Sequence, residues 1–415
     1  MHTDVLLICE DAKVNPTGNA ALLRKVNESA VLKLLREEGS FARAEIARHL
    51  QLSPPTITRI TADLIESGLV LEREAGNSTG GRPPTLLEFN ASAGSVVGVY
   101  IGQQMTGALA NLGGQVLARR SRDSVPGNAG VQRLTALIAD LMQEAEAQGL
   151  RVRGIAVGAP SIVHFPEGVV VWSPTLGWQN LPLKNILEEE LGVPVFIENE
   201  VNLIALGESW RGAGQGLENL VCISLGEGIG AGLILNGRLH RGAGSAAGEI
   251  GYMIPSEQCL GQEYDTFGCL EGIAGSLGII KRAKERLKAG EISVLGDESN
   301  NGAEPRPLTV DQVLSAARQG DVLACSVVSE TVDYLSLAIA NLTCLIAPER
   351  IIISGELAEF VDLFIEPIQR RMQGLIPHTP DIVVSKLKLD AVIFGAVAAA
   401  LRETSDALFV HPSQV

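Results

Sequence analysis

Two glycine-containing hairpin patterns are the segments of this sequence that could bind a phosphate group. The first, "VVGVYIGQQMTGALANLGG" (residues 96–114), is typical of a strand, a tight turn and a second strand. The second, "NLVCISLGEGIGAGLILNG" (residues 219–237), repeats this order around its G-E-G-I-G turn. Backbone N–H groups at such turns can face an anion. One such pattern is weak evidence, but two in order, with acidic loops between them, predict two related lobes around a cleft.

A hairpin that transfers a phosphoryl group also needs a carboxylate near its turn, to hold Mg²⁺ and its waters. In the first hairpin the candidate position holds Tyr100, and Gly102 is followed by Gln103 and Gln104. None of these side chains is a carboxylate. The hairpin is therefore either a working phosphate loop of unusual composition or a scaffold kept for another purpose.

The chain that must position these hairpins is long and unevenly charged. Its 415 residues, 46% of them hydrophobic and 20% charged, predict two or three domains with sizeable cores. The net charge is −15. Residues 13–82 nevertheless hold ten Lys and Arg against eight Asp and Glu, a balance of +2, whereas the chain from residue 91 onward holds 23 against 36, a balance of −13. A slightly basic head on an acidic body predicts two different tasks.

Composition also bears on the compartment. No run of about 18 apolar residues is evident, so we expect no membrane-spanning helix. The N-terminus lacks the basic region of a signal peptide. The cysteines are scattered, mostly in apolar surroundings, as expected of buried reduced thiols; they are Cys9, Cys222, Cys259, Cys269, Cys325 and Cys344. We predict a cytoplasmic protein with no membrane contact.

The head carries three helical patterns followed by two strand patterns. In "ALLRKVNESAVLKLLREEGS" one helical face is apolar: Leu23, Val26, Ala30, Val31, Leu34 and Leu35. "RAEIARHL" predicts a short second helix. "SPPTITRITADLIESGLV" predicts a third, N-capped by Ser53 with Pro54 at its first position. On this helix the expected buried residues are Ile57, Ile60, Leu64 and Ile65, and those expected to point outward or partly so are Thr56, Thr58, Arg59 and Thr61.

Three helices and a β-wing predict a winged helix-turn-helix over residues 13–90, with its third helix in the major groove of DNA. Short polar side chains and one arginine near the N-terminus of that helix suit base and phosphate contacts. The loop "NSTGGRPP" could deliver Arg82 to a narrow, A·T-rich minor groove. The predicted DNA-contacting residues are Ser53, Pro55, Thr56, Thr58, Arg59 and Arg82. The alternatives are a protein-interaction domain, a surface salt bridge for Arg59 and a solvated position for Arg82.

Further motifs extend over nearly the whole chain: "GGRPP", "SPTLGW", "FIENEVN", "GAGSAAGEIGYM", "GCLEG", "APERIIISGE" and "FGAVAAAL". Together with the head they resemble the ROK family (repressor, ORF, kinase) of transcriptional regulators. Kinases of this family have an actin-like fold of two lobes and phosphorylate a sugar held between them. Its repressors join a winged helix to that fold and respond to a sugar or to a partner protein.

The resemblance implies an α/β chain with an N-terminal winged helix-turn-helix and a two-lobed actin-like (ribonuclease H-like) sugar-kinase fold. Lobe 1 is expected over residues 91–200, completed by a C-terminal helix at about 390–405. Lobe 2, with the dimerisation surface, is expected over residues 201–389.

The resemblance also implies a sugar site. It places Asn199 and Glu200 where family kinases have an Asn and the catalytic Asp, which acts as a base on the sugar hydroxyl. Glu200 is one methylene longer, so it can accept a hydroxyl hydrogen bond but would misplace a base. Glu249 and Glu271 match family acids that contact sugar hydroxyls, and Tyr252 replaces a ligand-contacting histidine. Each acid alone also fits a helix N-terminus, but jointly they favour sugar binding.

Several positions depart from the pattern of the family's kinases. Those have an acid at the position of Tyr100, Gly and Thr at Gln103 and Gln104, and Thr at Glu227. The adenosine-side loop has "SGE", ending in Glu356, in place of a glycine run. Each change weakens anion or metal binding. We therefore expect a retained scaffold without kinase activity, with no catalytic residue and no cofactor.

The family's zinc site is also altered. The resemblance gives it a histidine and three cysteines, and the matching positions here hold Tyr252, Gln262, Tyr264 and Cys269. One ligand of four remains, and Cys259 is near but out of register. Tetrahedral zinc needs four ligands, so we predict no structural zinc.

We predict a sugar-responsive repressor of carbohydrate-utilisation genes. A homodimer or tetramer would bind a pseudo-palindromic, A·T-rich operator, and a monosaccharide effector would change lobe closure and half-site spacing. One alternative is an active sugar kinase with a DNA-binding head, which predicts ATP turnover. The other is a repressor controlled by a protein partner, which predicts indifference to substitution of Asn199, Glu249 or Glu271.

Overall fold

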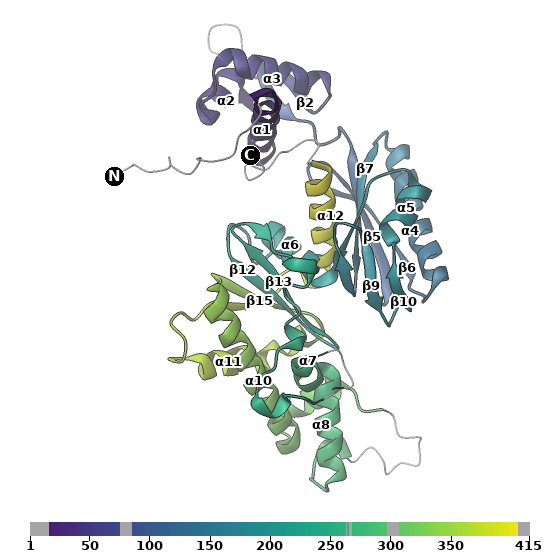
Figure 1. Ribbon diagram of the computed structural model, residues 1–415, viewed down its shortest axis with the longest axis vertical. Helices are drawn as coiled ribbons and strands as arrows, with labels where there is room; N and C mark the ends of the chain where they lie inside the picture. The colour runs from purple at the N-terminus through teal and green to yellow at the C-terminus, as the bar shows by residue number, and fades with distance from the viewer. Residues whose placement is uncertain (1–15, 75–84, 263, 265–267, 297–306, 406–415) are drawn as a thin grey trace.

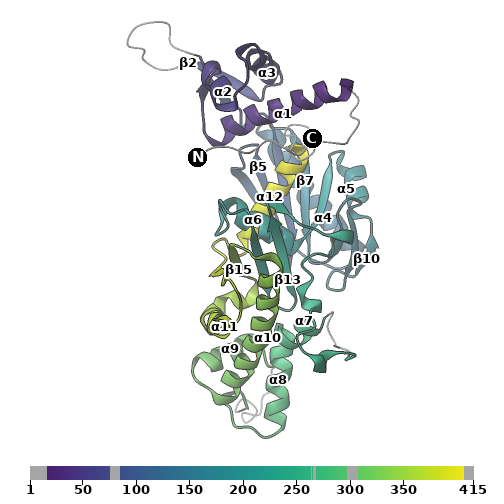
Figure 2. The same ribbon diagram turned by 60° about the vertical axis from the view of Figure 1, so that its left-hand side comes forward.

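The computed structural model describes residues 16–74, 85–262, 264, 268–296 and 307–405. The molecule is elongated, with a small helical head at one end followed by two α/β lobes (Figures 1 and 2). The polypeptide passes from the head through lobe 1 and lobe 2, and its last helix returns to lobe 1 (Figure 1).

The head is a winged helix-turn-helix, as predicted. Its elements are α1 (Pro16–Glu37), β1 (Phe41–Ala42), α2 (Arg43–Leu50), α3 (Pro54–Glu66), β2 (Val70–Glu74) and β3 (Thr85–Phe89). The three strands form a sheet in the order β1-β3-β2, with β2 and β3 antiparallel. Ile46, Ile57 and Leu87 are fully buried between the helices and this sheet.

Three predicted orientations in the head need correction. Leu23 is 48% exposed, whereas Leu32, which was not assigned to the buried face, is 1% exposed. Thr61 is fully buried rather than outward. Its hydroxyl donates to the carbonyl oxygen of Thr58 at 3.2 Å and accepts from Nε of Arg43 at 3.1 Å. These two hydrogen bonds satisfy the hydroxyl and explain why a threonine can occupy a core position.

The two lobes share one sheet topology. Lobe 1 has the strands β4 (Ser95–Ile101), β5 (Gln104–Asn111), β6 (Val116–Asp123), β7 (Val152–Ala159) and β11 (Val195–Asn199) in the order β11-β7-β4-β5-β6. Lobe 2 has β12 (Leu220–Leu225), β13 (Ile229–Leu235), β14 (Arg238–Leu239), β15 (Arg350–Ser354) and β16 (Asp381–Val384) in the order β14-β13-β12-β15-β16. In each sheet three antiparallel strands are extended by two parallel ones. The prediction of two related lobes is confirmed.

Helices cover both sheets. In lobe 1, α4 (Asn128–Ala147) and α5 (Leu183–Leu191) lie on one face, beside a small sheet of β8 (Ile162–His164), β9 (Val169–Ser173) and β10 (Trp178–Leu181). In lobe 2 the helices are α7 (Cys269–Ala274), α8 (Ser276–Lys288), α9 (Val310–Arg318), α10 (Val322–Ile346), η5 (Glu356–Leu363) and α11 (Ile365–Met372). The cores follow from this arrangement, because the helices bury their apolar faces on a sheet or, as α8 and α9 do, on other helices.

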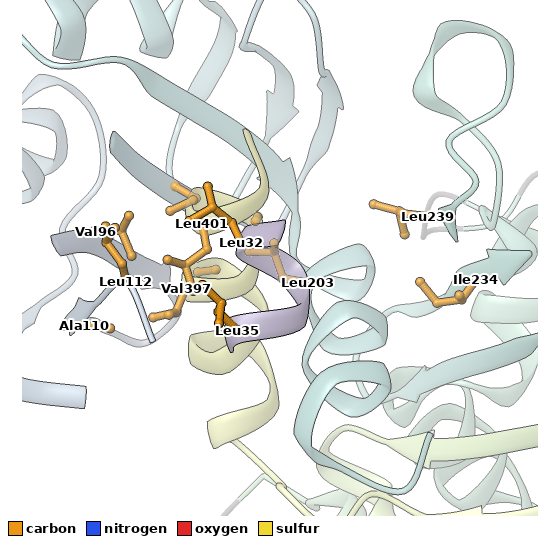
Figure 3. Close-up of a cluster of buried hydrophobic side chains, with 14 of the residues drawn as sticks. Leu32, Leu35, Val96, Ala110, Leu112, Leu203, Ile234, Leu239, Val397 and Leu401 are labelled. Carbon is orange, nitrogen blue, oxygen red and sulfur yellow. The ribbon is translucent and has the colours of Figure 1, made fainter. Parts of the chain in front are cut away.

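Two helices occupy the centre of the molecule, α6 (Glu200–Arg211) and α12 (Asp390–Ser405). They pack against each other; α12 also contacts β4 and β7 of lobe 1, and α6 contacts β12 and β13 of lobe 2. In Figure 3, Val397 and Leu401 of α12 lie between Val96 of lobe 1 and Leu203 of α6. Buried residues of α1 belong to the same apolar cluster, which therefore joins the head to the body.

One helix of lobe 2 departs from the sequence expectation. No membrane-spanning helix is expected from the sequence, yet α10 has the length and mean hydropathy of one. Of its most apolar window, 56% is buried inside the protein, where α10 packs against α7, α8, α9 and α11. This burial fits the core helix of a lobe. Cys325 and Cys344, both on α10, are exposed, so the expectation of buried thiols is wrong for them.

The contact between α6 and α12 is close enough to require glycine. A Cβ atom on Gly395 would lie 1.8 Å from the carbonyl oxygen of Leu203, and one on Gly207 would lie 2.0 Å from that of Ala391. We expect Gly395→Ala to lower the free energy of unfolding by about 2 kcal/mol or more, because overpacking exceeds the roughly 1 kcal/mol that alanine gains over glycine in a helix. Urea denaturation measures this change.

The control is Ser209→Ala on α6, which adds no atoms between the two helices. It should change the free energy of unfolding by less than about 0.5 kcal/mol. An unfolding free energy that rises in Gly395→Ala would contradict the close packing of the two helices.

Candidate functional site

The N-terminus of α3 has the capped geometry expected of a recognition helix. The hydroxyl of Ser53 accepts from the backbone N–H of Thr56 at 3.4 Å, and the two hydroxyl oxygens lie 2.8 Å apart. The hydroxyl of Thr58 donates to the carbonyl oxygen of Pro54 at 2.9 Å. Ser53, Pro55 and Thr58 are exposed and Thr56 is half-buried. The end of α3 therefore presents short polar side chains to the outside.

Arg59 differs from Arg24 and Arg43, two arginines of the head that form ion pairs. Arg24 forms an ion pair with Asp63 at 2.6 Å, and Arg43 forms one with Glu72 at 2.7 Å. Arg59 is exposed, and no carboxylate of the described part of the chain forms an ion pair with it. The alternative of a surface salt bridge for Arg59 thus finds no partner there. Arg82 lies outside the described residues.

In lobe 2, three of the predicted sugar-binding residues come together. Glu249 is the N-cap of the short helix η2 (Ile250–Tyr252), Tyr252 is its last residue, and Glu271 lies in the first turn of α7. Oε2 of Glu271 accepts from the backbone N–H of Ile229, at the start of β13, at 3.0 Å. Burial, with a smaller contribution from the charge of Glu271, raises the pKa of Glu249. Burial and both carboxylates raise the pKa of Tyr252.

The other two predicted residues lie at the N-terminus of α6. Asn199 is the N-cap: its Oδ1 accepts from the backbone N–H of Val201 at 2.7 Å, and its Nδ2 donates to the carbonyl oxygen of Ser161 at 2.9 Å. The side chain therefore has a structural task in addition to any contact with a ligand. Among the described residues, only one of its two amide hydrogens has an acceptor.

Glu200 has a partner that sequence reasoning missed. The hydroxyl of Tyr100, from the first hairpin, donates to Oε1 of Glu200 at 3.0 Å. Burial raises the pKa of Glu200, and the Tyr100 hydrogen bond offsets part of that rise. The ring of Tyr100 also covers the hairpin turn, since a Cβ on Gly102 would lie 2.7 Å from it. Tyr100 thus fills the turn and ties it to Glu200.

Strand β13 links the two groups of residues. Val201, next to Glu200, packs against the strand, since a Cβ on Gly230 would lie 3.1 Å from its side chain. On the same strand, the N–H of Ala231 donates to the carbonyl oxygen of Gly248, directly before Glu249, at 2.7 Å. All five predicted sugar-binding residues therefore lie along the junction between the lobes.

The turn of the second hairpin has a different character. The carboxylate of Glu356 accepts from the hydroxyl of Ser276 at 3.2 Å, and a Cβ on Gly226 would lie 3.7 Å from its Oε2. Glu227, at the turn itself, is exposed. Two carboxylates therefore approach the place where backbone N–H groups would face a phosphate. Like charges in one site raise the energy of binding an anion there.

The residues at the position of the family's zinc site do not fit that metal. The hydroxyl of Tyr264 hydrogen-bonds to the thiols of Cys259 and Cys269, and these bonds raise the pKa of Tyr264. Cys259 is therefore in the cluster despite being out of register in the sequence. In the part of the chain that the structure describes, no three His, Cys, Asp or Glu residues gather as metal ligands. Two thiols and a phenol leave the four-ligand requirement unmet.

Comparison with known proteins identifies the family. The sequence pattern of the ROK family matches residues 96–403, and that of the MarR family matches residues 26–75. The chain belongs to the ROK family. In this ROK protein the ROK match covers the body, and the MarR match lies in the head.

Three relatives illustrate the range of the ROK family. The xylose repressor of Caldicellulosiruptor bescii is 30% identical over 395 residues, which are 93% of this chain and 98% of the relative. The glucokinase of Halalkalibacterium halodurans is 36% identical over 248 residues, 58% of this chain and 74% of the relative. The crystal structure of a ROK family transcriptional regulator, a homolog of the E. coli MLC protein, covers 93% of this chain and 98% of its own with a TM-score of 0.80 and 29% identity.

The raised pKa of Glu249 predicts a dependence of stability on pH. The folded state holds this proton more tightly than the unfolded chain, so Glu249 makes the free energy of unfolding fall as pH rises above about 4.5. Glu249→Gln has no such proton. We expect the substitution to stabilise the protein more at about pH 8 than at about pH 5, as measured by urea denaturation at both values.

Glu189→Gln, an exposed position on α5, is the matched control and should show no such difference. If Glu249→Gln destabilised the protein equally at both pH values, contacts of the folded protein with the carboxylate would have to cancel the effect of burial on the pKa of Glu249.

Proposed function

We propose that this ROK protein is a DNA-binding repressor of carbohydrate-utilisation genes that responds to a monosaccharide. The observation that carries the proposal is the extent of the similarity to a xylose repressor, which covers head and body together. The similarity to a glucokinase covers a smaller part of the chain. In a regulator, a winged helix joined to a sugar-kinase fold could couple sugar binding to DNA binding, which neither part could do alone.

The proposed sugar site consists of Asn199, Glu200, Glu249, Tyr252 and Glu271. Sugar hydroxyls are hydrogen-bond donors, and buried carboxylates are acceptors that satisfy them. The support for this site is that Glu249, Tyr252 and Glu271 are close enough to influence one another's protonation. The N-terminus of α6 supplies the opposite wall, so a bound sugar would contact both lobes and bias their closure.

The proposed DNA-binding residues are Ser53, Pro55, Thr56, Thr58, Arg59 and Arg82. We propose that a homodimer or tetramer, assembled through lobe 2, places two heads on a pseudo-palindromic, A·T-rich operator in the cytoplasm. The units are the head at 13–90, lobe 1 at 91–200 with the helix at about 390–405, and lobe 2 at 201–389. The assignment of the helix at about 390–405 to lobe 1 is supported by the packing of α12 on the lobe 1 sheet, although lobe 2 lies between them in the sequence.

We propose further that the protein has no kinase activity. The Tyr100 hydroxyl occupies an oxygen of Glu200, the residue at the position of the family's catalytic base. Glu227 and Glu356 bring negative charge to the second hairpin, where a nucleotide phosphate would lie. A bound sugar would therefore remain unchanged and could act as a signal.

The proposal is tested by fluorescence anisotropy of the protein on its own upstream DNA at fixed salt, titrated with xylose, N-acetylglucosamine and glucose. Salt is fixed because phosphate contacts dominate affinity. We expect one sugar to shift DNA affinity by about 5- to 150-fold, the usual range of allosteric coupling. Glu249→Ala should remove the shift and leave DNA affinity without sugar unchanged, whereas the control Glu189→Ala should leave both the shift and the DNA affinity unchanged.

Tight DNA binding that no sugar alters would refute the sugar response and favour control by a protein partner. Formation of ADP when ATP is added with the active sugar would refute the loss of kinase activity.

Arg59 gives a separate prediction for the head. If its exposed guanidinium neutralises one DNA phosphate, Arg59→Ala weakens binding to all sequences about equally and lowers the slope of log affinity against log salt by about one. Arg24→Ala is the control, because Arg24 is already paired with Asp63. An unchanged slope in Arg59→Ala would exclude a phosphate contact.

A further inference from the structure

Glu198 is a buried carboxylate directly before the proposed sugar-binding residues Asn199 and Glu200. Its side chain is 3% exposed. Oε1 accepts from the backbone N–H of Asn199 and from Nδ2 of Asn202, both at 2.9 Å. These two bonds hold the end of β11 and the first turn of α6 in place. The remaining oxygen, Oε2, needs a donor, because an unpaired charge in a protein interior is strongly unfavourable.

That donor is Arg241, which comes from lobe 2. Its Nε donates to Oε2 of Glu198 at 2.7 Å, and its Nη2 lies 3.9 Å from Oε1 of Glu403 on α12. The guanidinium stacks 3.5 Å above the ring of Phe165, in the turn between β8 and β9. One lobe 2 side chain is thus enclosed by three separate elements of lobe 1.

The backbone of Arg241 serves the other half of the proposed site. Its carbonyl oxygen accepts from the N–H of Ala247 at 2.9 Å, which closes the loop that leads to Glu249. The same loop contacts lobe 1 a second time, where the hydroxyl of Ser245 accepts from the N–H of Phe165 at 3.3 Å. Arg241 therefore touches, through side chain and backbone, the supports of both groups of sugar-binding residues.

We propose that Arg241 is a positioning residue for the sugar site, acting across the lobes through Glu198. It fixes Asn199 and Glu200 only while the lobes are together, so the geometry of the sugar site depends on lobe closure. By linkage, a sugar that requires this geometry favours the closed arrangement. The proposal rests on the proposed sugar-binding function.

A simpler role for Arg241 is to neutralise the buried charge of Glu198 without any influence on the site. Single substitutions cannot separate the two roles, because Arg241→Gln leaves a buried carboxylate without its counter-ion. The double variant Glu198→Gln with Arg241→Gln removes both charges together and leaves amide groups that can still hydrogen-bond. If neutralisation were the whole role, this variant would behave as the wild type.

The experiment compares the full-length wild type, the double variant and a control pair, Arg318→Gln with Asp362→Asn, which removes an ion pair inside lobe 2. Amide hydrogen exchange is measured over residues 196–206, and the affinity for xylose, N-acetylglucosamine and glucose is measured by calorimetry. In the double variant we expect exchange at the start of α6 to be at least about tenfold faster. Sugar affinity should fall about 10- to 100-fold, with thermal stability close to that of the control pair.

Arg241→Lys keeps the charge next to Glu198 but loses the planar contact with Phe165, and should recover part of the affinity. Unchanged exchange at residues 196–206 in the double variant overturns the proposal whether or not a sugar binds. Faster exchange with unchanged sugar affinity also overturns it. If exchange is faster in the double variant but the wild type binds no sugar, the sugar-binding function is refuted, and with it the role of Arg241 in positioning a sugar site.

Discussion

The molecule depends on one close contact between backbones, that of α6 with α12. Gly207 and Gly395 let the two helices approach until a side-chain carbon on either would meet a carbonyl oxygen of the other. Gly98 of β4 extends this constraint, because a Cβ there would lie 2.7 Å from the backbone nitrogen of Val397. The lobe 1 sheet, α12 and α6 therefore form successive layers that cannot spread without leaving voids, and lobe 2 is built on the last of them.

This layering places α6 between the proposed ligand site and the head. Its first residue is Glu200, and its last two are Trp210 and Arg211, which stack on each other at 4.2 Å. Arg211 donates to the carbonyl oxygen of Gly114 in lobe 1 at 2.8 Å. A cavity of about 500 Å³ separates this end of α6 from the end of α1, including Arg36. A helix of twelve residues thus runs from the proposed ligand site to a cavity that is lined by residues of both the head and the body.

Local sequence patterns predicted the helices and strands, but they did not predict which side chains from distant parts of the chain meet. The Ser53–Pro54 cap and the apolar spacing of α3 predicted the recognition helix, because capping and periodicity act within a few residues. The repeated hairpin predicted two lobes for the same reason. Tyr100 and Glu200 are 100 residues apart, and no periodicity indicates that they meet. The pair of Glu198 and Arg241 was missed similarly, because β11 shows no alternation: Ile197 and Glu198 are both buried although they are adjacent.

The departures from a kinase that affect charge have a physical meaning. The acceptors suited to sugar hydroxyls, Glu249 and Glu271, are present beside each other, and the raised pKa of Glu249 reflects the burial of that place. Three changes bear on phosphate binding: Tyr100 takes the position of an acid at the first hairpin, and Glu227 and Glu356 add negative charge at or beside the turn of the second. If the proposed sugar site is correct, this asymmetry would favour a neutral polyol over a nucleotide, because only the nucleotide brings charges that these carboxylates repel. In the proposed regulator, a site that holds a sugar but repels a nucleotide would release its ligand intact, as a signal requires.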